Sequence, residues 1–148
     1  MNDYPVWWDQ TVTVYNKYTD PTTHRNSWQS TIVTGCFWKD REEITISKAI
    51  IIPSNIMICR IPLDDRFVER YVWEEMPEET RAKFFTLSPG DILVRGAVVE
   101  PIDEYSSGSR LTDFVAKQKR LRGCMQIEQS TINVGTGRVL EHYLLKGK

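Results

Sequence analysis

The residues best suited to acid–base or metal chemistry are pairs of adjacent carboxylates. These pairs are Glu42-Glu43, Asp64-Asp65, Glu74-Glu75, Glu78-Glu79 and Asp103-Glu104. A glycosidase needs two carboxylates that flank one bond across a fixed gap. Adjacent residues of a strand point to opposite faces, and adjacent residues of a loop are usually solvated. The spacing therefore favours neither a glycosidase site nor a metal site.

The remaining chemistry-bearing residues are scattered. His24 lies in a polar stretch and His142 in the last apolar run, and neither has a cysteine or a second histidine at ligand spacing. Ser106-Ser107-Gly108 is typical of a loop rather than of a strand-to-helix elbow. Gly135-Thr136-Gly137 lacks the lysine and the following helix that a phosphate loop requires. We expect no catalytic, cofactor-binding or metal-binding residues, and no enzyme.

The totals indicate one domain, residues 1–148, that folds without a metal or a disulfide. Cys36, Cys59 and Cys124 are widely spaced among apolar neighbours, which is typical of buried thiols. The formal net charge of -1 argues against a free DNA-binding protein. Met1 leads into polar and aromatic residues rather than a signal peptide, and no apolar run is long enough to span a membrane, so we expect synthesis in the cytoplasm and no membrane partner.

One helix carries a basic face. Residues 109–123 place Leu111, Phe114, Val115 and Leu121 close to one side, and Gly123 suits the position after the helix end. The other side carries Arg110, Lys117, Lys119, Arg120 and Arg122. A solvated surface whose cations lie at the negative end of the helix dipole explains most of this pattern. The functional interpretation is contact with an acidic partner or with nucleic-acid phosphate.

The first half of the chain is predicted to be mainly strand. Residues 10–18 alternate with period two, and a second strand over 28–38 follows a polar hairpin tip at 21–27. Residues 39–43 are expected to form a charged turn before a third strand that begins at Ile44. Two further β-rich pieces, 49–52 and 56–61, are expected on either side of a breaker at Pro53-Ser54-Asn55. Residues 63–75 have no clear pattern.

The second half contains a central turn, a loop and two further strands. Ser88-Pro89-Gly90-Asp91 predicts a type II turn that leads into a strand over 92–99. A short helix is expected near 78–84, a long loop at 101–109, and a C-terminal hairpin of 124–132 and 138–145 that turns at 133–137. We predict a mainly β (α+β) fold, a small β-barrel or sandwich with one α-helix at about 110–122.

Several of these blocks resemble small structural proteins encoded in the head-to-tail gene region of tailed phages and prophages of Gram-positive bacteria. The resemblance lies in composition and order rather than in a catalytic signature, and it covers most of the chain. Its blocks are Thr11–Tyr18, Trp28, Gly35–Trp38, Phe84–Gly96, Ile102–Tyr105 and the helix from Leu111 to Leu121.

The resemblance implies a virion protein of the phage neck: a head-completion, adaptor or stopper subunit that forms a ring between portal and tail. It implies a homo-oligomer whose partners are portal, adaptor and tail proteins, with one loop that meets packaged DNA in the lumen. The residues expected at interfaces are Trp7, Trp8, His24, Arg25, Asp103, Glu104 and Tyr105. Those expected to contact DNA or an acidic neighbour are Lys117, Lys119, Arg120 and Arg122.

Two alternatives remain open. A tail-terminator subunit belongs to the same region of the virion but caps the tail tube. A small nucleic-acid-binding β-barrel, which would use the basic helix, belongs to a different class. The neighbour that the chain binds would distinguish a neck subunit from a tail terminator. A DNA affinity that falls steeply as salt rises would favour the nucleic-acid-binding barrel.

Overall fold

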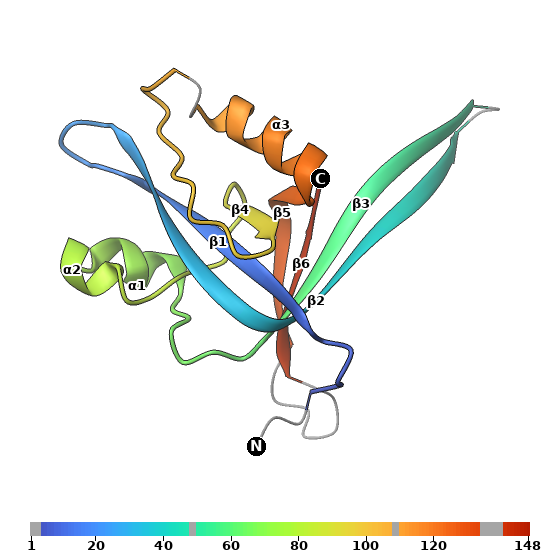
Figure 1. Cartoon of the computed structure of the whole chain (residues 1–148), viewed down its shortest axis with the longest axis horizontal. Helices are drawn as coiled ribbons and strands as arrows, with labels where there is room; N and C mark the ends of the chain where they lie inside the picture. The colour runs from blue at the N-terminus through green and yellow to red at the C-terminus, as the bar shows by residue number, and fades with distance from the viewer. Residues whose placement is uncertain (1–3, 48–49, 108–109, 134–140) are drawn as a thin grey trace.

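The computed structural model describes residues 4–47, 50–107, 110–133 and 141–148. Six antiparallel strands close into a barrel in the order β1-β2-β3-β6-β5-β4 (Figure 1). The prediction of a small, mainly β fold is confirmed, and the barrel alternative is the correct one. The strands are β1 (Gln10–Thr19), β2 (Asn26–Ser47), β3 (Ile50–Pro62), β4 (Ile92–Arg95), β5 (Cys124–Asn133) and β6 (His142–Gly147).

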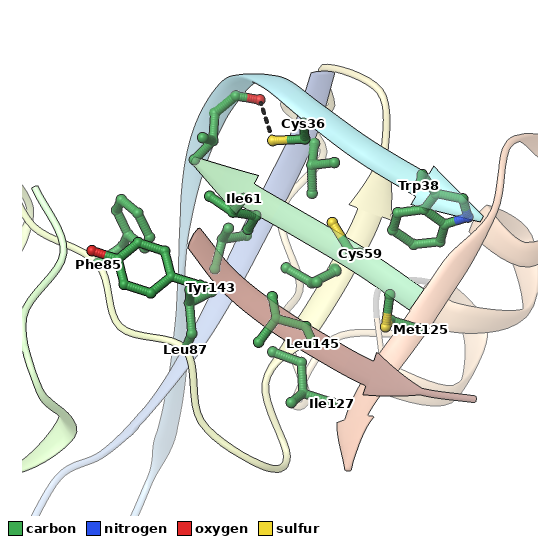
Figure 2. Close-up of a cluster of buried hydrophobic side chains, with 14 residues drawn as sticks. Cys36, Trp38, Cys59, Ile61, Phe85, Leu87, Met125, Ile127, Tyr143 and Leu145 are labelled. Atoms are coloured by element: carbon green, nitrogen blue, oxygen red, sulfur yellow. Dashed lines mark hydrogen bonds between the residues drawn. The ribbon is translucent and has the colours of Figure 1, made fainter. Parts of the chain in front are cut away.

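The barrel interior holds the larger of two apolar clusters. Val12, Val14 and Leu93 are fully buried there. Side chains of β2, β3, β5 and β6 belong to the same cluster, among them Trp38, Cys59 and Leu145 (Figure 2). The second cluster lies where Tyr15 and Val94 pack with Phe114 of the long helix. Strand β1 is therefore buried on both faces, which explains why polar Thr13 and Asn16 are also inaccessible to solvent.

The helices differ in part from the expected ones. Helix α3 (Leu111–Leu121) lies where it was predicted, and α2 (Glu78–Arg81) confirms a short helix in the predicted region. Helix α1 (Arg70–Glu75) was missed; its only buried residue is Trp73. In α3, Leu121 is 55% exposed and Gln118 is fully buried, so the expectation that Leu121 packs on the sheet was wrong. Gln118 is satisfied by Glu100, whose Oε2 accepts its Nε2–H at 2.9 Å.

Strands β2 and β3 are much longer than predicted. The expected charged turn at 39–43 lies inside β2, and the expected breaker at 53–55 lies inside β3. The two strands pair without a break from Phe37↔Arg60 to Ser47↔Ile50. They leave the barrel together and project from it as a two-stranded ribbon (Figure 1). The predicted C-terminal turn at 133–137 lies largely outside the described residues.

The turn at Ser88–Asp91 anchors the barrel to the helical side. Gly90 has φ 97°, as the predicted type II turn requires at this position, and Asp91 N–H donates to the Ser88 carbonyl at 3.0 Å. The Asp91 carboxylate is 1% exposed and accepts from Asn16 Nδ2 at 2.9 Å, from the Lys17 N–H at 3.1 Å and from Arg70 Nη1 at 3.2 Å. Burial raises the pKa of Asp91, and these donors oppose that rise. One side chain thus ties the turn to β1 and α1.

Candidate interaction surfaces

The tip of the β1–β2 hairpin is a compact turn. The Asp20 carboxylate accepts the Thr22 and Thr23 N–H groups at 2.7 and 3.1 Å. His24 has φ 58°, and its N–H donates to the Asp20 carbonyl at 2.8 Å. The backbone hydrogen bonds to Thr23 and Thr22 lower the pKa of Asp20. His24 and Arg25 are exposed on this tip, as the sequence predicted.

The loop from Pro101 lies against this hairpin. Tyr105 Oη accepts the Asn26 N–H at 2.9 Å, and the Arg25 guanidinium lies 4.0 Å from the centre of the Tyr105 ring. Trp28 Nε1–H donates to Glu104 Oε2 at 2.8 Å. The structure therefore brings Arg25, Glu104 and Tyr105, all predicted interface residues, into one surface. The loop predicted at 101–109 therefore contacts the hairpin of its own chain through Glu104 and Tyr105.

A hollow of about 470 Å³ opens beside this surface, between the hairpin, α2 and the loop. Its wall includes Arg81, which is only 9% exposed. The Arg81 guanidinium stacks 3.6 Å from the centre of the Tyr18 ring, and its Nη1 donates to the Met76 carbonyl at 2.9 Å. Sequence reasoning missed this stack because Arg81 and Tyr18 are far apart in the chain. The contact between the Arg81 guanidinium and the Tyr18 ring holds α2 against β1.

The two adjacent tryptophans near the N-terminus have different surroundings. Trp8 is buried: its ring stacks on Tyr4 at 5.2 Å between centroids and meets His142 edge-on at 5.6 Å. Trp7 is 65% exposed, and Val6 beside it is 90% exposed. Of the two predicted interface residues, Trp7 is thus the one that the isolated chain presents to solvent.

The basic face of α3 is exposed along its length, but one of its cations is already paired. Lys117 Nζ lies 2.6 Å from Glu100 Oε1, and this hydrogen bond is the largest cause that lowers the pKa of Glu100. Arg122 Nη1 donates to Gln118 Oε1 at 2.7 Å. Lys119 and Arg120 are exposed and form no ion pair within the described part of the chain, so they are the residues of this face best placed to meet an acidic partner.

The ribbon of β2 and β3 is the surface that sequence reasoning did not foresee. Strand β1 pairs with β2 only as far as Cys36, and β6 pairs with β3 only as far as Met57. Beyond these points, among the described residues, the two strands pair only with each other. We call this part, Lys39–Ser47 with Ile50–Ile56, the arm. The high density of β-branched residues over 44–61 was its only sequence signal.

Within the described ranges, no cluster of three or more His, Cys, Asp or Glu side chains could hold a metal ion. The three cysteines are free and buried, and burial raises the pKa of the Cys36 and Cys124 thiols to about 12, so these thiols stay protonated. No helix in the described part of the chain is long and apolar enough to cross a membrane.

The fold and these surfaces define a small closed antiparallel β-barrel with a projecting β-ribbon. Residues 7–148 match a family of unknown function, DUF6751, and the chain belongs to this family. No curated protein and no solved structure matches the chain.

Proposed function

We propose that the protein is a structural subunit of the neck of a tailed phage, which oligomerises into a ring between portal and tail. The arm carries this proposal. An isolated two-stranded hairpin is at best marginally stable in water. Nine residues at about 3.3 Å each would extend this one roughly 30 Å. A neighbouring subunit that covered this ribbon would stabilise it, so a projecting ribbon of this length suits a protein that assembles with others.

Other features support an assembly role. Trp7 and Val6 expose apolar surface at a position other than the arm, and aromatic residues are enriched at protein interfaces. The near-neutral net charge suits a protein whose partners are proteins. A subunit with two different contact surfaces can repeat head to tail, and such heterologous contacts close into a ring when the rotation allows it.

The test is native mass by light scattering across a concentration series, for the chain alone and mixed with the portal and tail proteins of its own gene neighbourhood. We expect a ring to form when one of these partners is added. Assembly with the portal supports a head-completion, adaptor or stopper subunit, and assembly with the tail protein alone supports a tail terminator. A chain that remains monomeric with both partners would overturn the neck proposal.

A variant without the arm sharpens this test. Replacing residues 41–56 by Asn-Gly joins Asp40 to Met57, which are paired in register, through a two-residue hairpin turn. We expect this variant to keep the barrel but to lose ring formation. The matched control is Asp113→Asn, which removes an exposed charge from α3 outside the predicted contact surfaces and leaves the arm intact; it should still assemble.

The second candidate is a nucleic-acid-binding barrel, favoured by the exposed Lys119 and Arg120. It predicts that the isolated protein binds DNA with an affinity that falls steeply as salt rises. Lys119→Glu with Arg120→Glu should then abolish binding. A chain that shows no DNA binding at low salt removes this candidate.

A further inference from the structure

An apolar groove lies between helix α3 and the barrel, and we call it the α3 groove. Its lining includes Ile92 of β4, which is 1% exposed, and the half-buried Leu111 and Val115 of α3. These three side chains belong to the second apolar cluster or pack against it. The groove has a volume of about 340 Å³. Since a cavity of about 150 Å³ can hold a benzene ring, the groove has room for one large aromatic side chain.

The turn that begins at Pro5 presents an aromatic side chain on a fixed support. Trp8 N–H donates to the Pro5 carbonyl at 3.0 Å, which closes the turn and places Val6 and Trp7 at its tip. The Trp8 ring stacks on Tyr4, whose hydroxyl donates to the backbone of the segment before β6. Because the residues on both sides of the tip are held by the barrel, little conformational entropy is lost when the tip meets a partner.

The turn and the groove lie far apart in one molecule. Figure 1 shows the N-terminal segment and α3 on opposite sides of the barrel. Trp7 is exposed in its own chain, so it does not fill its own α3 groove. A contact between these two surfaces therefore joins two molecules.

The turn and the groove also carry opposite charges. Lys119 lies at the groove, and Asp9 follows Trp7 by two residues; both are exposed and form no ion pair within the described part of the chain. Trp7, Trp8 and Asp9 are exposed, buried and exposed in turn, so Trp7 and Asp9 point away from the barrel together. Gln126, which also lines the groove, offers an acceptor for an indole N–H.

We infer that Trp7 of one copy inserts into the α3 groove of a second copy, with Asp9 of the first facing Lys119 of the second. The occupant of the groove is thus another molecule of the same chain. Because the two surfaces differ, the contact is heterologous and repeats head to tail. The inference deepens the neck proposal and rests on it for the closure of the ring, whereas the contact itself involves this chain alone.

The first experiment measures self-association of the full chain by sedimentation equilibrium, without portal or tail proteins. We expect Trp7→Ser to weaken it roughly tenfold or more, because buried tryptophans dominate the energetics of interfaces. The matched control is Tyr71→Ser, which removes an exposed aromatic side chain from α1 and should leave the dissociation constant unchanged. Circular dichroism controls for folding.

The second experiment tests whether the contact is heterologous. Ala116→Glu fills the α3 groove with a charged side chain, and glutamate is a good helix former, so α3 should persist. We expect neither Ala116→Glu nor Trp7→Ser to self-associate when alone. In a mixture, the intact turn of the first variant can enter the intact groove of the second. The mixture should therefore form a heterodimer that grows no further.

The third experiment tests the charge pair. Lys119→Glu places a carboxylate against Asp9, so we expect self-association to weaken roughly threefold or more. Combining Asp9→Lys with Lys119→Glu restores opposite charges and should recover the affinity.

Four results would overturn the inference. They are a chain that stays monomeric at every concentration, self-association that Trp7→Ser leaves unchanged, a mixture of the two folded variants that stays monomeric, and a double charge exchange that folds but fails to recover affinity. A ring that forms with portal or tail protein and persists in Trp7→Ser would remove this contact and leave the neck proposal standing. Self-association through Trp7 without a ring would do the reverse.

Discussion

Strand β2 contributes to two hairpins with very different surroundings. Near Asn26 it pairs with β1, and the loop from Pro101, helix α2 and the Arg81 stack surround that end. Beyond Trp38 it pairs with β3 alone in the described part of the chain (Figure 1). We call the first of these regions the covered hairpin. The same strand therefore belongs to the packed body of the protein near Asn26 and to the projecting arm beyond Trp38.

The difference shows how the two regions can divide structure and assembly between them. The covered hairpin is tied to the rest of the chain by hydrogen bonds from distant residues, such as Asn26 N–H to Tyr105 Oη at 2.9 Å. These contacts close within one chain and contribute to the stability of the monomer. Along the arm, β2 and β3 pair only with each other among the described strands, so we expect its contribution to appear mainly when a second chain is present.

The largest expected effect is the loss of Asp91, which joins β1 to the helical side. Asp91→Ala leaves donors of Asn16, Lys17 and Ser88 without this acceptor, and it removes one of the two ion partners of Arg70, the other being Glu74. We expect a loss of about 3 kcal/mol in the free energy of unfolding, measured by urea denaturation. The control is Asp65→Ala at an exposed position, which should cost less than about 0.5 kcal/mol. Equal losses would contradict an anchoring role for Asp91.

The next effect compares two arginine–tyrosine stacks that differ in burial. Arg81→Met removes a 9% exposed guanidinium from the Tyr18 ring and a hydrogen bond to Met76, and we expect a loss of about 2 kcal/mol. Arg25→Met removes an exposed guanidinium from the Tyr105 ring and should cost about 0.5 kcal/mol. Thermal and urea unfolding of both variants measure the difference. If Arg25→Met costs as much as Arg81→Met, burial does not set the strength of these stacks.

Two carboxylates should give opposite dependences of stability on pH. The pKa of Asp91 is raised, mainly by burial, so its folded form binds a proton more tightly than its unfolded form. Acidification from neutral pH towards 3.8, its ordinary value, should therefore increase the advantage of the wild type over Asp91→Asn. The hydrogen bond from Arg66 lowers the pKa of Asp64, so its contribution is present above 3.8 and is lost as pH falls through the lowered value.

The measurement is the free energy of unfolding of wild type, Asp91→Asn and Asp64→Asn from neutral pH to well below 3.8, so that the range includes the lowered pKa of Asp64. The wild-type advantage over Asp64→Asn should shrink on acidification, opposite to its trend against Asp91→Asn. Two slopes of the same sign would show that burial does not dominate at Asp91.

The smallest expected effect on stability is the removal of the arm. Replacing residues 41–56 by Asn-Gly should change the free energy of unfolding by less than about 1 kcal/mol, because an isolated hairpin contributes little by itself. The register from Phe37↔Arg60 to Asp40↔Met57 is kept. Urea denaturation of the monomer at low concentration checks this. A loss above about 2 kcal/mol would show that the arm supports the barrel within a single chain.

Short-range sequence patterns predicted the elements that depend on residues close together in the chain. Alternation predicted β1, Pro89 and Gly90 predicted the turn before β4, and helical spacing with Gly123 predicted α3. The exposed tip with His24 and Arg25 was also predictable, because polar turn formers gather there. Cysteine burial followed from the apolar neighbours of each thiol.

Only the tertiary structure revealed the projecting arm and the role of Asp91 as a buried anchor. The alternating charges of Lys39–Glu42 have the composition of a turn, but strand pairing with β3 over a long register overrode that local preference. Asp91 was predictable as a turn residue and not as a buried anchor, because its partners Asn16 and Arg70 lie far away in sequence. The sequence by itself thus determined the period of the strands, the turns and the long helix. Only the closed barrel decided which polar groups are buried and which strand edge remains open, because both depend on contacts between distant segments.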